Sequence, residues 1–321
     1  TDQCIKYREE IHAIAGMEFN VNSTKQLREI LFEKLGLTPG KKTKTGFSTD
    51  AATLERLRGE HPIVEKILSY REVEKLRSTY GEGLLSSVGS EDRIRATFKQ
   101  TVARTGRLSS DAPNLHNIPV RTEAGRAFRK AFVPAEGFSL LVADYNQIEL
   151  RCIAHLAEDP GLIRAFEAGE DVHTSVAAQV WNLDPSAVDS ETRSRAKMVS
   201  YGLAYGMEAY GLAQRLDIPR EEASEILTAF FEAFPAVREY MDRSIKEARK
   251  KGYTETLFGR RRRIPELSSS NFNVRQAGER QAMNSAIQGL AADIFKVALI
   301  GIDKHIEESF LASRLILQVH D

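Results

Sequence analysis

Two short apolar segments, far apart in the chain, each lead to an aspartate. Residues 138–143 precede Asp144, and residues 313–319 precede His320 and Asp321. Short runs rich in Leu, Ile and Val predict strands, and a sheet can place the ends of two distant strands side by side at one rim. Most aspartates at strand ends are solvated turn formers, so position alone favours ordinary turns over a metal site.

Helical patterns surround these two segments. Apolar spacing predicts helices over 50–57, 63–80, 148–240 and 274–305, a strand-like segment over 93–102 and a hairpin over 253–263. Pro219 is expected just before a helix start, and Pro235 at an interruption. We therefore expect a mixed α and β chain that is predominantly helical.

Composition constrains the class of protein only loosely. The 321 residues carry 45 Lys and Arg against 45 Asp and Glu, and this zero net charge argues weakly against nucleic acid. Basic runs lie at 41–44, 249–251 and 260–263, and for any single run a solvated face is the favoured interpretation. Cys4 and Cys152 lack a Cys/His pattern and are expected to be reduced packing residues. No window approaches the roughly 20 apolar residues of a membrane span, which favours a cytoplasmic protein.

Three segments, DYNQIELR at 144–151, RSRAKMVSYGLAYG at 193–206 and QVHD at 318–321, resemble the motifs of family A, DNA polymerase I-type, DNA polymerases. They occur in the family's order. Similar segments at 105–110, 113–119 and 288–293 extend the resemblance over nearly the whole chain. The sequence departs from the usual residues at four places: Asn146, Ser200, His116 and Leu290. These departures suggest a divergent bacterial or phage-like member and put fidelity and template contacts in doubt rather than the reaction.

The resemblance implies a right-hand architecture with an antiparallel palm sheet. Residues 1–86 would form a thumb with a mobile basic tip near 39–48, and 87–157 the first part of the palm. Residues 158–285 would form fingers with a nucleotide-binding helix at 191–206, and 286–321 the second part of the palm. Because a strand that delivers an acid needs a partner for its edge groups, we expect the palm to continue beyond Asp321.

The implied reaction adds a deoxynucleotide to a primer 3′-hydroxyl, with no proofreading domain in this chain. Asp144 and Asp321 would hold two magnesium ions, with the Tyr145 carbonyl as a further ligand, since magnesium prefers oxygen ligands. Primer-template DNA and dNTPs are the implied partners. We expect a monomer that associates with the nucleoid and not with a membrane.

Arg193, Lys197, Tyr201 and Tyr205 recur every fourth residue, and this spacing keeps them on one slowly winding helix face. Aromatics at this spacing usually pack in a core, but a core stripe would not begin with two cations. With the resemblance, Arg193 and Lys197 would hold the incoming triphosphate and Tyr201 would stack on the nucleotide. Tyr205, followed by Gly206, would lie near the templating base.

Other roles are implied by the resemblance residue by residue. Glu149 would exclude a ribose 2′-hydroxyl, although a carboxylate near a helix N-terminus also favours the helix dipole. His173 would lie near the phosphates, although a lone histidine is more often a structural donor, and Gln147 would contact the nucleotide. The implied primer and template contacts are Arg107, Asn114, Arg280, Asn284, Gln288 and His320, with Lys41, Lys42 and Lys44 gripping phosphates.

Two alternatives stay open at this point. A single-subunit RNA polymerase also shows an Arg-Lys-Tyr helix, but Glu149 and the primer-contact segments favour DNA. A non-catalytic DNA-binding remnant is conceivable because the sequence ends at Asp321.

Overall fold

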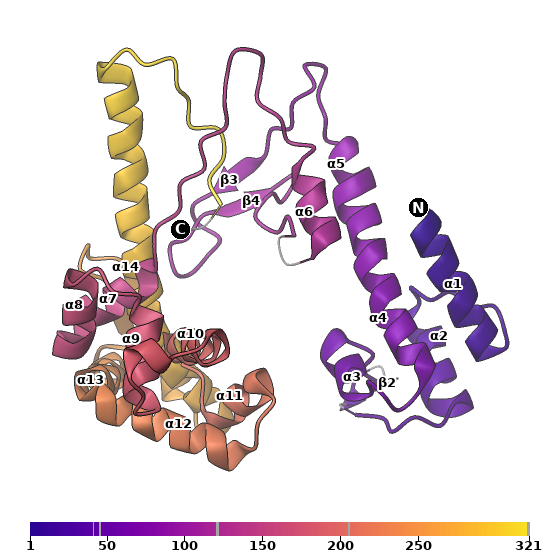
Figure 1. The fold of residues 1–321 in the computed structure, drawn as a ribbon, viewed down its shortest axis with the longest axis horizontal. Helices are drawn as coiled ribbons and strands as arrows, with labels where there is room; N and C mark the ends of the chain where they lie inside the picture. The colour runs from indigo at the N-terminus through magenta and orange to yellow at the C-terminus, as the bar shows by residue number, and fades with distance from the viewer. Residues whose placement is uncertain (41, 45, 120–121, 205, 320–321) are drawn as a thin grey trace. The chain divides into compact units, whose positions relative to one another are not determined.

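The structure, a computed structural model, describes every residue except 41, 45, 120–121, 205 and 320–321 (Figure 1). The chain forms two units. Unit 1 comprises Thr1–Thr97 and Ser110–Ser139, and unit 2 comprises Phe98–Ser109 and Leu140–Asp321. The strands β3 (Thr97–Lys99) and β4 (Ser109–Asp111) lie where the chain passes from one unit to the other. Of the strand-like segment expected over 93–102, only β3 is a strand.

Unit 1 is built around two packed helices, α1 (Asp2–Ala15) and α4 (Pro62–Lys75). Ile11, Ile63 and Ile67 are fully buried because the apolar residues of both helices recur on the face toward the partner. The other elements are α2 (Thr24–Arg28), η1 (Glu29–Lys34), β1 (Lys42–Thr43), β2 (Gly46–Phe47), α3 (Ala51–Arg56), η2 (Leu76–Glu82), α5 (Gly83–Leu85) and α6 (Glu123–Arg129). The helices expected over 50–57 and 63–80 are confirmed, the second as α4 continued by the π-helical η2.

The basic segment of unit 1 has a short ordered pairing. Lys42 pairs with Phe47 and Thr43 with Gly46 in the antiparallel strands β1 and β2. Lys42 and Lys44 are exposed, whereas Lys41 lies outside the described residues. The mobility expected for this tip stays a prediction.

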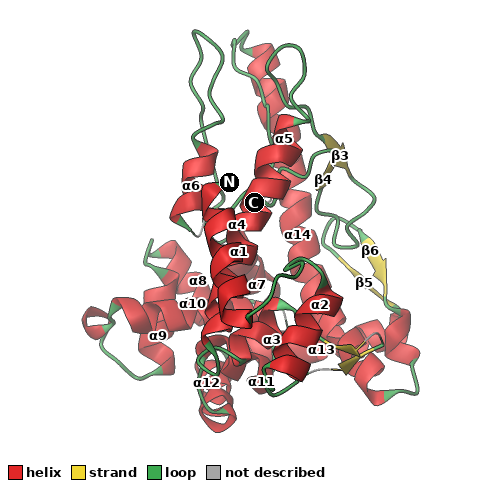
Figure 2. Cartoon of the chain, turned by 90° about the vertical axis from the view of Figure 1, so that its right-hand side faces the viewer, coloured by secondary structure: helices red, strands yellow, loops and turns green. Residues whose placement is uncertain are grey.

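Unit 2 is a mostly helical assembly (Figure 2), with a large apolar core and a smaller buried cluster of Ala248, Ile264, Leu267 and Ala282. Its helices are α7 (Ile148–Ala157), α8 (Pro160–Glu167), α9 (Val172–Val180), η3 (Pro185–Ala187), α10 (Ser190–Ala204), α11 (Ala209–Leu216), α12 (Arg220–Ala233), α13 (Pro235–Lys251), η4 (Pro265–Ser268) and α14 (Phe272–Glu308). Pro219 occupies the N-cap position of α12, and Pro235 is the first residue of α13, where proline is favoured. The helical pattern expected over 148–240 is confirmed.

A hairpin in unit 2 carries four consecutive arginines. The strands β5 (Tyr253–Glu255) and β6 (Arg261–Arg263) pair antiparallel, which confirms the hairpin expected over 253–263. Arg260 lies 2.6 Å from the carboxylate of Asp293, Arg261 lies 3.0 Å from Glu255, and Arg262 donates to Ser285 and Gln281. Arg263 is exposed. Much of this basic run is therefore engaged inside the unit.

The helix α14 changes character along its length. Ile287, Leu290 and Ala291 belong to the core of unit 2, while Val297 and Ile300 are more than half exposed in the later turns, drawn in yellow in Figure 1. Within the described part of the chain, α14 is the one helix long and apolar enough to cross a membrane by length and composition. Its apolar window is 44% buried, and the core positions of Ile287, Leu290 and Ala291 make this part of α14 a core helix of unit 2.

The two strands expected before the aspartates are not formed in the described residues. Residues 138–144 and 311–319 have neither helix nor strand, and Leu141 and Val142 are 93% and 86% exposed. An apolar run indicates that a segment is suited to burial, but a strand also needs a neighbour for its backbone N–H and C=O groups. The sequence pattern identifies the segment and not its neighbour. The antiparallel sheet that would join both segments is therefore absent from the described chain.

Both cysteines are free and buried, as the sequence predicts. Burial raises the pKa of the Cys152 thiol to about 12, and it also raises the pKa of Cys4. Both are therefore thiols at neutral pH and act as small packing residues.

Candidate functional site

The start of α9 and the first turns of α10 form a polar cluster in unit 2. Asp171 is the N-cap of α9, and its carboxylate lies 2.6 Å from Nε of Arg193 on α10. Burial raises the pKa of Asp171, but the Arg193 guanidinium and the backbone N–H groups of His173 and Thr174 outweigh it and hold the pKa below its usual range. Asp171 is therefore an anion, and the structure brings it together with Arg193 and His173.

His173 lies next to this ion pair and is buried. It is 2% exposed, and its ring packs against the ring of Tyr201 with centroids 5.8 Å apart. Burial is the main cause that lowers the pKa of His173; Asp171 opposes it, Arg193 and Lys197 add to it, and together these effects bring the pKa to about 4. The imidazole is therefore neutral at physiological pH and offers one ring N–H for donation.

The two faces of α10 differ in burial, and this difference tests whether its aromatic residues pack in the core. Ala196, Val199 and Leu203 form the buried face, with exposures of 5% or less. Arg193 and Tyr201 are only half-buried, and Lys197 is exposed. The stripe of cations and aromatics read from the sequence is thus not the core face. Tyr205 lies outside the described residues.

Glu149 lies in the first turn of α7 and is 3% exposed. A buried carboxylate needs a partner, and Nη2 of Arg107 lies 2.7 Å from its Oε1. The neighbouring Gly106 allows the close approach of Arg260, because a Cβ there would lie 2.6 Å from Nε of Arg260 and φ is +87°. Gln147 precedes α7 with a left-handed backbone at φ 57°. The structure therefore joins Arg107 and Glu149, two residues singled out separately from the sequence.

Gly206, the second residue after α10, packs against α14. A Cβ on Gly206 would lie 3.2 Å from the Cβ of Arg280, and Arg280 forms an ion pair with Glu208 at 3.1 Å. Further along the same helix, Gln288 is 8% exposed, and the Oδ1 of Asn284 is buried without a hydrogen-bond partner in the described part of the chain. Gly206 and Arg280 also line a cavity of about 550 Å³ between α10, α12, α13 and α14.

Asp144 is exposed, in the irregular segment that leads into α7. The next residue, Tyr145, packs its ring against Phe295 of α14 with centroids 6.3 Å apart. No group of three or more His, Cys, Asp or Glu that could hold a metal occurs among the described residues. Asp321 and His320 lie outside them. Asp144 fits a magnesium ligand by its donor chemistry and its exposure, while the pairing of the two carboxylates stays a prediction.

Of the predicted contacts that the structure describes, three belong to unit 1. Asn114 accepts a hydrogen bond from the backbone N–H of His116 at 3.0 Å, so its side chain shapes the loop that carries it. Lys42 and Lys44 are exposed at the β1–β2 tip. These residues stay predicted DNA contacts.

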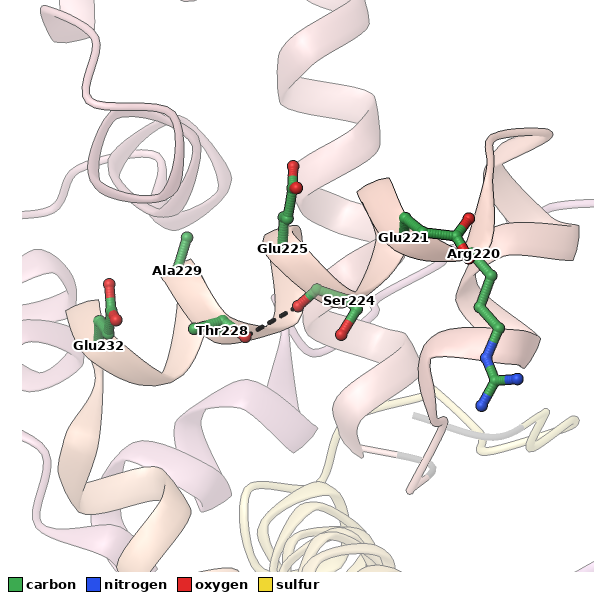
Figure 3. Close-up of a pocket in the computed structure, with 7 residues that line it drawn as sticks. All are labelled: Arg220, Glu221, Ser224, Glu225, Thr228, Ala229 and Glu232. Carbon is green, nitrogen blue, oxygen red and sulfur yellow. Dashed lines mark hydrogen bonds between the residues drawn. The ribbon is translucent and has the colours of Figure 1, made fainter.

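A shallow hollow elsewhere in unit 2 follows the exposed face of α12 (Figure 3). Its acids are Glu221, Glu225 and Glu232, and Oγ1 of Thr228 donates to the backbone oxygen of Ser224 at 2.9 Å. None of the sequence-predicted site residues lines it. Acidic side chains would repel phosphates, so this face does not suit nucleotide or DNA.

Asp171 is a functional residue of this cluster for which the sequence alone predicted no role. A usable signal existed, because an aspartate just before a helix is a strong N-cap candidate. The ion pair with Arg193, which lies in a different helix, leaves no local trace in the sequence.

Comparison with known proteins identifies the family of the chain over its whole length. The family model described as DNA polymerase family A matches residues 1–321. DNA polymerase I of Mycobacterium bovis and that of Geobacillus stearothermophilus are each 50% identical over 323 residues; the alignments cover 100% of this chain but 36% and 37% of those proteins. A solved structure of the POL domain of Pol1 from M. smegmatis, in complex with DNA primer-template and dNTP, matches with a TM-score of 0.93 and 49% identity. That match covers 100% of this chain and 57% of the solved one.

The fold is therefore that of a nucleic-acid polymerase domain. The chain belongs to DNA polymerase family A. It spans little more than a third of the length of the curated relatives that it matches.

Proposed function

We propose that this chain is the polymerising part of a template-directed DNA polymerase, which adds dNTPs to a primer 3′-hydroxyl. The observation that carries the proposal is the α9–α10 cluster, where Arg193 pairs with Asp171 and the buried ring of His173 packs against Tyr201. Arg supplies a fork of donors for phosphate oxygens, a neutral His supplies one donor, and an aromatic ring can stack on any base. The related POL domain was solved with primer-template and dNTP, which supports the same ligands here.

Catalysis would depend on carboxylates that hold two magnesium ions. Asp144 and Asp321 are the proposed ligands, with the Tyr145 carbonyl as a third donor. Magnesium, when bound, supplies activation of the 3′-hydroxyl and charge stabilisation at the triphosphate. The chain itself would orient the nucleotide: Arg193 and Lys197 bind phosphates, and Tyr201 and His173 shape the place of the sugar and base.

Selection of deoxynucleotides is assigned to Glu149. Its carboxylate is held by Arg107 at 2.7 Å and is almost fully buried, so it cannot easily move aside for an extra hydroxyl. Arg107 would thereby hold Glu149 in the position that excludes a 2′-hydroxyl, in addition to making its predicted primer contact. Gln147, Gly206, Arg280, Asn284 and Gln288 are the remaining proposed contacts of unit 2.

We further infer the right-hand division given by the sequence, with the thumb at 1–86, the palm at 87–157 and 286–321, and the fingers at 158–285. Neutral composition with local basic runs is compatible with DNA contact by Lys42, Lys44 and their neighbour Lys41. The curated relatives are bacterial proteins, which supports a cytoplasmic, nucleoid-associated enzyme that works as a monomer.

Primer extension with magnesium tests the proposal directly. The chain is mixed with a labelled primer-template and either four dNTPs or four rNTPs, with and without magnesium. Magnesium-dependent extension with dNTPs is expected. Preferential use of rNTPs would favour the RNA polymerase alternative, and failure to extend despite tight primer-template binding would favour the non-catalytic one.

A further inference from the structure

Asp171 contacts both sides of the α9–α10 cluster through one carboxylate. Its Oδ1 accepts from the backbone N–H groups of His173 at 3.0 Å and Thr174 at 3.4 Å, and its Oδ2 accepts from Nε of Arg193 at 2.6 Å. The first two bonds cap α9 and fix the backbone of His173. The third holds Arg193 of the neighbouring helix. One side chain therefore sets the separation of two proposed phosphate donors.

The bond to Nε leaves the terminal edge of the guanidinium for another anion. A guanidinium has five N–H donors in a planar fork, and Asp171 takes the one on Nε. Among the residues that the structure describes, no second carboxylate forms an ion pair with Arg193. Parallel donors on the fork bind carboxylates and phosphates in a bidentate manner. The Nη1 and Nη2 groups are therefore suited to a phosphate while Asp171 keeps its place.

An ordinary surface ion pair is the alternative explanation. The side chains of Arg193 and Asp171 are 43% and 37% exposed, and exposed pairs contribute little to folding stability. The pair between Arg195 and Glu191 is of that kind, because it joins one turn of α10 to the next. The Asp171 carboxylate instead joins two helices while it caps one of them. Its effect is expected in ligand binding more than in stability.

His173 depends on this cap for its position. Its ring is almost fully buried against Tyr201, and its Nδ1 has no hydrogen-bond partner within the described residues. A ring that is packed on nearly all sides cannot move independently of its backbone. The place of its one N–H donor therefore follows the N-terminus of α9, which Asp171 caps.

We propose that Asp171 is a positioning residue for the nucleotide triphosphate, which holds Arg193 and His173 at a fixed separation so that both meet phosphate oxygens of one nucleotide. The inference rests on the proposed function, because it takes Arg193 as a nucleotide contact. Asp171 would act only through these two side chains. Such supporting contacts keep a binding site in its productive geometry.

Asp171→Asn is the informative variant, because Asn caps a helix as well as Asp does but lacks the second anionic oxygen. The equilibrium Kd for a dNTP is measured on a chain-terminated primer-template, so that no reaction intervenes, and KM and kcat are measured on an extendable primer. Both Kd and KM should rise by about fivefold, the scale of an exposed ion pair. The change in kcat should be smaller, and primer-template affinity should not change.

Asp184→Asn is the matched control. Asp184 also caps a helix in unit 2, through the backbone N–H of Ser186 at 2.8 Å, and it lies in the exposed turn before η3. This variant loses the same charge and keeps a cap, without an arginine partner among the described residues. Its Kd and KM for dNTP should equal those of the parent chain.

The double variant with Arg193→Ala separates the inference from the proposed function. Arg193→Ala alone should weaken dNTP binding, and adding Asp171→Asn should then cause almost no further loss. If Asp171→Asn leaves dNTP binding unchanged, improves it, or weakens it equally with and without Arg193, the positioning role is wrong while the function stands. If Arg193→Ala itself leaves dNTP binding unchanged, the proposed nucleotide site is wrong, and the inference fails with it.

Discussion

The α9–α10 cluster and the two segments that lead to Asp144 and Asp321 are both proposed to take part in the same reaction. The described chain forms regular structure and side-chain contacts in the first region but not in the second. In the cluster, Arg193 has a carboxylate partner at 2.6 Å and His173 is buried against Tyr201. The segments 140–144 and 311–319 are irregular and largely exposed. A helix satisfies its backbone within itself, whereas a strand requires a second segment. Each helix of the cluster is therefore complete within its own stretch of sequence, whereas a strand is complete only with a partner segment.

The largest expected effect concerns the proposed metal ligands Asp144 and Asp321, in the region where the described chain forms no sheet. Asp144→Ala should reduce extension by at least about a thousandfold, because a lost metal ligand removes several kcal/mol of transition-state stabilisation. Primer-template affinity should change little, since phosphate contacts supply most of it. Asp321→Ala should behave alike. Single-turnover extension rates and DNA binding measured on the same preparations decide it, and rapid turnover in either variant would contradict the metal assignment.

A second test concerns the buried pair of Glu149 and Arg107. Glu149→Ala should lower the preference for dNTP over rNTP by roughly ten- to a hundredfold, because it removes the crowding that an added hydroxyl meets. Glu149→Gln keeps the volume and loses the charge, so it should retain most of the preference. Competition between dNTP and rNTP measures both. If the alanine variant keeps the same preference for dNTP over rNTP, Glu149 does not exclude ribonucleotides.

Tyr201 allows a test within the well-built cluster. Its hydroxyl can donate to a phosphate oxygen in place of the nucleotide's own 3′-hydroxyl, so a dideoxynucleotide need not leave that acceptor unpaired. An unpaired buried polar group costs roughly 1–3 kcal/mol, equivalent to about ten- to a hundredfold. The chain should therefore accept ddNTPs almost as well as dNTPs, and Tyr201→Phe should restore rejection while normal extension continues. Strong rejection by the unaltered chain, read as termination frequency, would refute this role.

The smallest expected effect is the contribution of His173 to the pH dependence of folding stability. Its folded pKa of about 4 lies below the ordinary value of 6.5, so the unfolded chain binds the proton first as pH falls. The contribution of the neutral imidazole is complete above about pH 6.5 and is lost progressively toward pH 4, by no more than about 2 kcal/mol at pH 5.

Denaturant unfolding of the parent chain and of His173→Gln at pH 7 and pH 5 measures this loss. The variant should lose less stability than the parent over the same interval, since its amide does not titrate. Equal losses would show that His173 is not held neutral by the fold.

Helical periodicity predicted most of the architecture. The stripe of α10 was predicted to be a polar and aromatic face, and Ala196, Val199 and Leu203 form the opposite, buried face. Pro219 marked a helix start and Pro235 an interruption, and both predictions are confirmed, since α12 ends at Ala233 and α13 begins at Pro235. These predictions succeeded because they depend on residues only a turn or two apart.

Contacts between distant residues could not be predicted in the same way. Nothing local in the sequence relates Asp171 to Arg193 or Arg107 to Glu149, since each pair is formed by the packing of separate elements. The strands expected before Asp144 and Asp321 were wrong for the described chain because apolar composition does not specify a pairing partner. Residues such as Asn114 and Lys42 were matched to roles that the structure leaves as predictions.

The arginine hairpin has a consequence for how this chain would respond to salt. Each lysine or arginine that neutralises a DNA phosphate releases condensed counterions and adds about 0.9 to the slope of log affinity against log salt. Arg260 is held by Asp293, Arg261 by Glu255, and the partly buried Arg262 by Gln281 and Ser285. Of this run, Arg263 is the residue best placed to release counterions. The run of four positive charges should therefore add about one unit to the slope rather than nearly four.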